Sequence, residues 1–149
     1  MGLGLLDYQS GNFNEAIEKF LQISKQDPKH DKAYCGLGLV YYELGKKDLA
    51  IEYYVRSLDS DIENGTALTS LLNLSYEVNQ FDTIERVLIN YLELHPANMN
   101  MLYGLAGIQY KMNRNAEAKE TLNKILIFHP DHEDALELLA HVEMAALSN

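Results

Sequence analysis

Cys35 and five histidines are the residues of this chain whose side chains could carry nucleophilic, acid–base or metal chemistry. A thiolate attacks carbon centres and binds metals, and an imidazole moves protons or binds a cation. The densest group is His129-Pro130-Asp131-His132-Glu133, which could offer surface ligands to a metal. A structural metal site needs further cysteines or a second histidine-bearing face, and the sequence has neither. We therefore predict no metal site.

Cys35 has two interpretations. It could be a reactive thiol, and Lys32, three residues earlier, is the only cation that helical spacing could bring near it to lower its pKa. The alternative that we favour is a small apolar side chain on a binding surface.

Other signs of catalysis are missing from the sequence. No phosphate-binding glycine loop, dinucleotide fingerprint, zinc-protease helix or nucleophile elbow occurs in it. The acidic residues are scattered singly and form no pair suited to acid–base work. We predict no catalytic residues and no cofactor, and hence a protein that is not an enzyme.

The charge of the chain bears on the class of its partners. The formal net charge is −10, whereas nucleic-acid binding requires a basic surface. No apolar run approaches the ~20 residues of a membrane span, so we expect neither nucleic-acid binding nor membrane insertion. A basic or amphipathic peptide suits the charge. The single cysteine and the lack of a secretory signal make the cytoplasm the expected location.

The prolines and several tyrosines follow a common 34-residue spacing. Pro96 and Pro130 are 34 residues apart, and Pro28 precedes Pro96 by twice that distance. At another phase of the same spacing stand four tyrosines: Tyr8, Tyr42, Tyr76 and Tyr110. A fixed period of this length is typical of a stacked array of similar units.

We number each unit from 1 to 34, with the prolines at position 32. The whole chain, 1–149, is then predicted to be a single repeat domain. Its parts are a truncated repeat 1 (1–30), repeat 2 (31–64), repeat 3 (65–98), repeat 4 (99–132) and a C-terminal helix (133–149).

Each unit is predicted to form two helices joined by a turn. In repeat 2, apolar residues recur at spacings of three and four on both sides of Gly45, which marks the turn. Gly11, Asn79 and Asn113 occupy the equivalent positions of the other units. Glycine and asparagine both tolerate a left-handed backbone, so we expect a turn at each of these positions. Asn64 and Asn98 are predicted to cap the helices that follow them.

Repeat 2 carries the pattern that is most specific. Tyr34-x2-Leu37-Gly38-x2-Tyr41, followed by Ala50-x3-Tyr54, resembles the tetratricopeptide repeat. The resemblance extends over essentially the whole chain and implies an all-α, right-handed α-solenoid of about four helix–turn–helix units plus a terminal helix. Some positions depart from the pattern and should loosen repeats 3 and 4: Leu72 and Ala106 in place of glycine, and Ser75 and Gln109 in place of tyrosine.

In proteins of this kind, positions 2, 5, 9, 12 and 13 of the first helices line a concave groove that holds a peptide. The resemblance thus implies a set of partner-binding residues: Leu5, Tyr8, Cys35, Leu39, Tyr42, Thr69, Asn73, Tyr76, Tyr103, Tyr110 and Lys111. The tyrosines of position 12 could instead pack between neighbouring first helices, and both roles can hold at once. Lysine and arginine are missing from positions 5 and 9, which argues against the carboxylate clamp with which some family members bind a chaperone tail.

The C-terminal helix is the second candidate surface. A terminal helix of an array should expose a polar face, yet this one is largely apolar. We expect a homo-oligomer contact at Leu136, Leu139, Ala140 and Met144. Two functions therefore stay open: an adaptor or scaffold that binds a partner peptide or helix in its groove, and a self-assembling structural scaffold whose unfinished ends drive oligomerisation.

Overall fold

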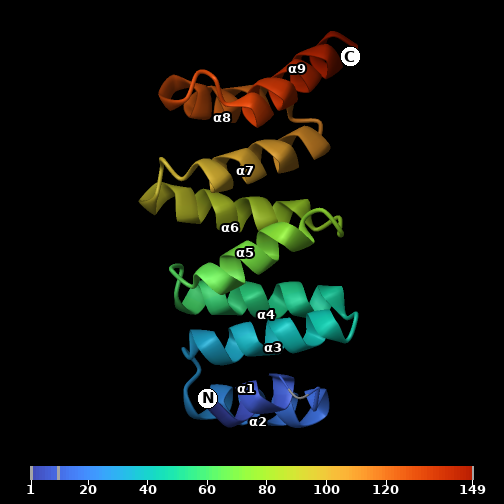
Figure 1. Ribbon diagram of the computed structural model, residues 1–149, viewed down its shortest axis with the longest axis vertical. Helices are drawn as coiled ribbons and strands as arrows, with labels where there is room; N and C mark the ends of the chain where they lie inside the picture. The colour runs from blue at the N-terminus through green and yellow to red at the C-terminus, as the bar shows by residue number, and fades with distance from the viewer. Residues whose placement is uncertain (1, 10, 149) are drawn as a thin grey trace. The chain divides into compact units, whose positions relative to one another are not determined.

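The computed structural model describes residues 2–9 and 11–148, and every regular element within these ranges is an α-helix (Figure 1). The helices pair through short turns. In chain order they are α1 (Gly2–Gln9), α2 (Phe13–Gln26), α3 (Asp31–Glu43), α4 (Lys47–Ser60), α5 (Gly65–Leu74), α6 (Phe81–Leu94), α7 (Met99–Lys111), α8 (Asn115–Phe128) and α9 (Glu133–Ser148).

The chain forms two compact units, Met1–Val78 with α1 to α5 and Asn79–Asn149 with α6 to α9. The first and second helices of the predicted repeat 3, α5 and α6, thus belong to different units. The 34-residue division into repeats stays a prediction, with helix starts that follow its spacing.

Side chains at position 34 cap the first helices. His30, Asn64, Asn98 and His132 each accept a hydrogen bond from the backbone N–H three residues later, at 3.1, 3.0, 3.2 and 3.2 Å. The caps at the two asparagines were expected. The two histidines do the same work through Nδ1, because an unprotonated ring nitrogen is also an acceptor.

Three of the four predicted turns inside the helix pairs have a glycine or asparagine with a left-handed backbone. Gly11, Gly45 and Asn113 have φ of 82°, 74° and 59°. Asn79 lacks a positive φ, because α5 ends at Leu74 and the chain turns earlier there. Ser75 donates its hydroxyl to the carbonyl of Leu72, a local bond that competes with helix continuation.

Aromatic rings packed on glycines set the helix spacing in the first unit. The ring of Tyr54 on α4 lies so close to Gly38 on α3 that a Cβ at that glycine would be 2.5 Å from it. The ring of Phe20 on α2 lies equally close to Gly36 of α3, and 2.8 Å from a Cβ placed on Gly4 of α1. Both rings are about 1% exposed and form the centre of the unit's core.

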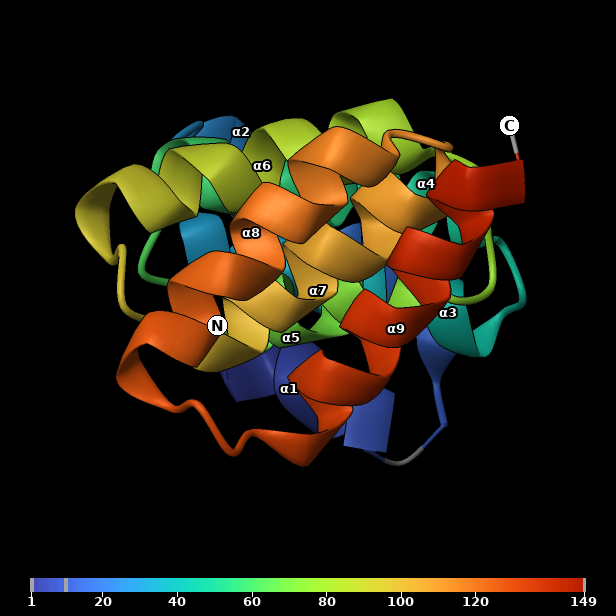
Figure 2. The same cartoon turned by 90° about the horizontal axis from the view of Figure 1, so that it is seen from above.

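The second unit uses smaller residues at the same positions. Ala106 on α7 and Leu122 on α8 are both fully buried, so alanine and leucine replace the glycine–aromatic pair. Gln109 accepts a 2.7 Å hydrogen bond from the buried hydroxyl of Thr121, which satisfies a polar side chain where repeat 2 has a tyrosine. Figures 1 and 2 both show α9 beside α8. None of the described helices combines the length and the apolar character that a membrane crossing demands.

Candidate functional site

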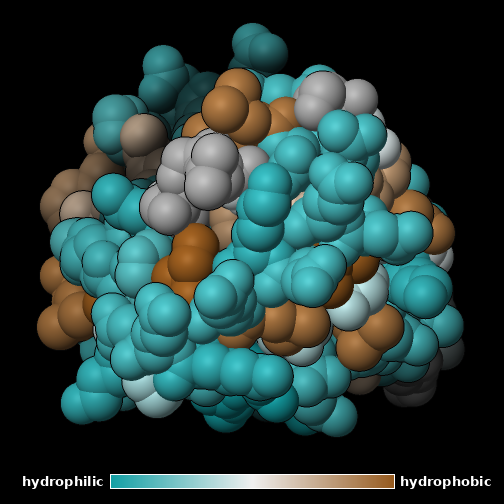
Figure 3. Space-filling model, turned by 90° about the horizontal axis from the view of Figure 1, so that it is seen from below, coloured by the Kyte–Doolittle hydropathy of each residue, from teal (hydrophilic) through white to brown (hydrophobic). Residues whose placement is uncertain are grey.

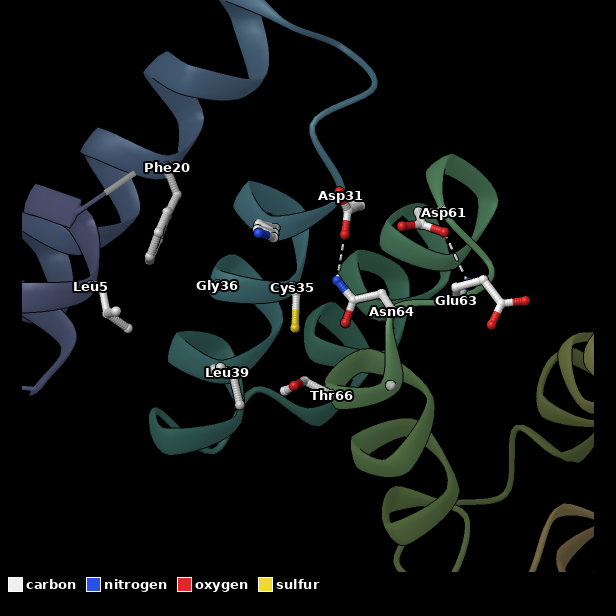
Figure 4. A pocket seen from close by; sticks show the side chains of 12 residues that line it. Leu5, Phe20, Asp31, Cys35, Gly36, Leu39, Asp61, Glu63, Asn64 and Thr66 are labelled. Atoms are coloured by element: carbon white, nitrogen blue, oxygen red, sulfur yellow. Dashed lines mark hydrogen bonds between the residues drawn. The ribbon is translucent and has the colours of Figure 1, made fainter. Parts of the chain in front are cut away.

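A hollow of about 450 Å³ opens on the first helices of the first unit (Figure 4). We call it the main hollow; α1, α3 and the chain between α4 and α5 surround it. Its apolar wall contains Leu5 of α1 and Cys35 and Leu39 of α3. Three predicted partner-binding residues from two helices thus share one surface, because positions 5 and 9 of a repeat lie on the same side of its first helix.

Charged side chains surround the other end of the main hollow. Asp31, Lys32, Asp61 and Glu63 contribute three carboxylates and one ammonium. In Figure 4, Asp31 and Asp61 lie at the end away from Leu5, whereas Glu63 points away from the other labelled side chains. The hollow therefore has an apolar wall and an excess of negative charge at its edge.

Hydrogen bonds hold the two nearer carboxylates in place. Asp31 accepts a 2.6 Å hydrogen bond from the Asn64 side-chain amide. Asp61 accepts a 2.9 Å bond from the backbone N–H of Glu63, which fixes the turn. Each carboxylate has about four acceptor positions, so these bonds leave room for a further donor.

Cys35 belongs to the apolar wall. It is 5% exposed, and burial, followed by the nearby Asp31 carboxylate, raises the pKa of its thiol to about 11. The reactive-thiol interpretation gave Lys32 the controlling influence, but the charge that acts on the sulfur is that of Asp31 and has the opposite sign. A thiol with this pKa is neutral and a poor nucleophile at neutral pH.

A second, smaller opening of about 180 Å³ shares Leu39 with the main hollow, and we call it the side hollow. Its lining includes Tyr42 and Asn73, two further predicted partner-binding residues. Thr69 and Tyr76 are exposed but line neither hollow.

Tyr8 and Tyr42 each contact a glutamate 35 residues further along. The hydroxyl of Tyr42 donates a 3.2 Å hydrogen bond to Glu77, whose other oxygen lies 2.7 Å from the Lys47 ammonium. The pKa of Tyr8 is raised by burial and by Glu43. The Tyr8 side chain thus contacts α3, and the Tyr42 hydroxyl contacts the turn that follows α5, while Tyr42 keeps 38% of its surface exposed.

The predicted residues of the second unit lie in other surroundings. Tyr103 stacks on His132 with ring centroids 6.4 Å apart, and the Lys111 ammonium lies 5.7 Å from the centre of the Phe81 ring. Tyr110 is half-buried. Within the described ranges, no group of three or more histidine, cysteine or acidic side chains could hold a metal ion.

The predicted oligomer contact forms an apolar stripe on α9. Leu136 and Met144 are 44% and 68% exposed, Ala140 is exposed and Leu139 is half-buried. Leu147, 88% exposed, extends the stripe although the sequence reasoning did not include it. Spacings of three and four residues put these side chains on one side of the helix.

Sequence reasoning also missed the acidic edge of the main hollow. Asp31 begins α3 and Asp61 follows the end of α4, and acidic residues at helix ends are usually solvated. The pairing of α3 with α4 through a short turn brings the end of α4 beside the start of α3. A usable signal was that Asp31 lies one helical turn before Cys35, on the same side of the helix.

Three family models match the chain. One described as TPR repeat matches residues 4–45, and two described as Tetratricopeptide repeat match 31–61 and 76–142. A comparison with curated proteins found no match.

Solved structures with the same fold include MamA, with a TM-score of 0.74, 20% identity and coverage of 98% of this chain and 80% of that one. YrrB, described as a TPR protein with an unusual peptide-binding site, has a TM-score of 0.71 and 18% identity, and the match covers 95% of this chain and 73% of YrrB. Pseudomonas aeruginosa PilF has a TM-score of 0.63 and 23% identity, and the match covers 99% of this chain and 67% of PilF.

These identities bear on the fold alone. The fold of MamA, YrrB and PilF and the helix-only architecture of the described residues confirm the predicted all-α solenoid class. With family matches over residues 4–61 and 76–142, the chain belongs to the tetratricopeptide repeat family.

Proposed function

We propose that this chain is a non-enzymatic protein-interaction module, which binds a peptide or helix of a partner on the first-helix surface of its first unit. The observation that carries the proposal is the main hollow, where Leu5, Cys35 and Leu39 form an apolar wall open to solvent. Concave sites with an apolar lining and a few polar groups are typical of ligand binding. The peptide-binding site for which YrrB is described makes the same role reasonable here.

The side hollow extends the proposed contact to Tyr42 and Asn73. A tyrosine ring supplies a large, rigid contact area, and an amide can bond a peptide backbone. Tyr8, Thr69 and Tyr76 in the first unit, and Tyr103, Tyr110 and Lys111 in the second, stay predicted contacts.

The proposal can be tested by selection from a displayed library of random peptides. Leu39 lines both hollows, so Leu39→Glu places a charge in the contact surface. We expect enriched peptides to bind the original chain and to lose at least about tenfold in affinity for this variant, because a charge would be buried against an apolar anchor.

The matched control is Ile127→Glu, which introduces the same charge at a side chain that is 72% exposed on α8. Circular dichroism establishes that both variants are folded. Peptides that bind the Leu39→Glu chain as well as they bind the original would show that the main hollow is not the site.

We also propose a second function, self-association into a scaffold through α9. The observation in its favour is the exposed stripe of Leu136, Ala140, Met144 and Leu147. The face of the molecule in Figure 3, on the α1–α2 side, is mostly hydrophilic with separate hydrophobic spots.

Sedimentation velocity over a concentration series tests this second function. We expect association of the original chain and loss of it in Met144→Glu, whereas Ile127→Glu should associate normally. A chain that sediments as a monomer at every concentration would exclude the scaffold.

A further inference from the structure

We propose that the main hollow selects a basic peptide, with one large aliphatic side chain against its apolar wall and a lysine or arginine beside Asp31 and Asp61. This inference rests on the proposed function of the same surface and adds the chemistry of the partner.

The apolar half of the partner follows from the wall. Leu5, Cys35 and Leu39 present hydrocarbon and a neutral thiol, and the hollow is about 450 Å³. An aliphatic side chain is stabilised when it leaves water for this wall, whereas a polar side chain would lose hydrogen bonds to water there.

The basic half follows from the edge of the hollow. Three carboxylates stand there against the single ammonium of Lys32. Asp31 and Asp61 are held in place by Asn64 and by the turn, so they lose little freedom when a cation arrives. A lysine or arginine would complete their unused acceptor positions with charge-assisted bonds.

The charge of the chain disfavours other occupants. An acidic peptide or a nucleic acid would bring negative charge against Asp31 and Asp61. A second copy of this chain carries a net charge of −10 and would be repelled in the same way. A basic segment is attracted from a distance as well as at the edge.

The probes are three fluorescein-labelled peptides that differ only in charge. All have leucines at i, i+3, i+4 and i+7. The remaining positions are lysine in one peptide, glutamine in the second and glutamate in the third. Fluorescence anisotropy should show the lysine peptide binding about tenfold more tightly than the glutamine peptide. Each partly exposed charge pair should raise the affinity by a few-fold, and more than one pair can form. The glutamate peptide should bind most weakly.

Two conservative variants locate the effect at the edge. Asp31→Asn and Asp61→Asn remove the charge while an amide oxygen can still accept the bonds from Asn64 and from the Glu63 N–H. Each variant should weaken the lysine peptide about threefold and leave the glutamine peptide unchanged.

Asp27→Asn is the matched control. Asp27 stands 34 residues before Asp61 in the equivalent turn, where it accepts a 3.1 Å bond from the Lys29 backbone N–H, and it does not line the main hollow. This variant should bind all three peptides as the original chain does.

The outcomes separate the two proposals. Equal binding of the three peptides, with loss in Leu39→Glu, would overturn the basic preference and leave the hollow as a peptide site. A preference for the lysine peptide that Asp27→Asn reduces as much as Asp61→Asn would show general charge attraction and also overturn it. Failure of all three peptides and of the random library would remove the proposed function itself.

Discussion

The thiol of Cys35 is the most sharply defined chemical group in the main hollow. Its raised pKa, about 11, means that the thiolate is scarce at neutral pH and becomes abundant only near that value. We expect alkylation by iodoacetamide at neutral pH to be roughly a hundredfold slower than for a free cysteine, because the thiolate is the nucleophile.

Mass spectrometry of the alkylated chain measures this rate, and unfolding in urea supplies the control by restoring ordinary reactivity. A rate in the folded chain equal to that in urea would contradict the buried, neutral thiol.

The histidine caps of α3 and α9 should contribute to stability. His30 and His132 each accept, through Nδ1, a hydrogen bond from a backbone N–H at the start of a helix, which has no partner within the helix itself. We expect the double variant His30→Ala, His132→Ala to lose about 1 kcal/mol per cap in the free energy of unfolding, whereas His30→Asn, His132→Asn, which keeps an acceptor at both positions, should stay close to the original chain.

Urea unfolding measures the difference, with the caps Asn64 and Asn98 unchanged in both variants. Equal stability of the alanine and asparagine double variants would contradict the role of the histidines.

Glycines 38 and 107 should respond in opposite ways to a methyl group. Gly38→Ala drives a Cβ to 2.5 Å from the Tyr54 ring, so we expect a loss of about 1–3 kcal/mol in the free energy of unfolding. Gly107 lies inside α7, where a Cβ added to it would have nothing within 4 Å, and Gly107→Ala should gain about 0.5–1 kcal/mol.

Chemical denaturation of the two variants provides the comparison. Equal effects of the two substitutions would mean that helix propensity, and not contact with the ring, decides the role of Gly38.

At the scale of elements, α5 is shorter than α3 and α7, the first helices of the neighbouring repeats. It ends at Leu74, whereas α3 and α7 continue to Glu43 and Lys111 at the equivalent position 13. Threonine, serine and asparagine side chains are frequent along it and compete for its backbone groups. We expect amide hydrogen exchange within the first unit to be fast from Ser75 to Val78 and slower in the interior of α3, because the turn has fewer helical hydrogen bonds.

Exchange monitored by mass spectrometry gives this contrast directly. Protection of residues 75–78 equal to that of α3 would contradict an early helix end.

Most of this element pattern could be predicted from spacing. The 34-residue period predicted the helix pairs, and Asn64 and Asn98 predicted two caps, because these depend on local chemistry. The period could not predict the early end of α5, since it gives only the spacing of the helices, whereas the Ser75 hydroxyl bonds locally to the Leu72 carbonyl. The histidine caps were missed because histidine is a rare cap whose role depends on its tautomer.

At the scale of the whole molecule, charge governs both proposed functions. Copies with a net charge of −10 repel one another, and salt screens that repulsion. Self-association through α9 should therefore strengthen as salt is raised, while capture of the lysine peptide should weaken. Light scattering and anisotropy over one salt series measure both, and association that weakens with salt would contradict an apolar α9 contact.

The sequence could predict the family, because the motif and its 34-residue period lie along the chain itself, whereas the partner-binding residues stay a prediction. It could not predict that Leu5, Cys35, Leu39, Tyr42 and Asn73 gather around two hollows in the first unit, nor that the chain forms two units. Both depend on how helices distant in sequence pack, and Leu72 and Ser75 gave only a hint of weaker packing in repeat 3.

The ring of Phe20 fills the space beside two glycines that belong to successive repeats, Gly4 and Gly36. These three positions therefore depend on one another sterically: a larger residue at either glycine requires a smaller one at Phe20. Anyone who transplants repeat 2 into another array must carry the preceding aromatic with it, because the exchangeable module of this chain does not coincide with its 34-residue period.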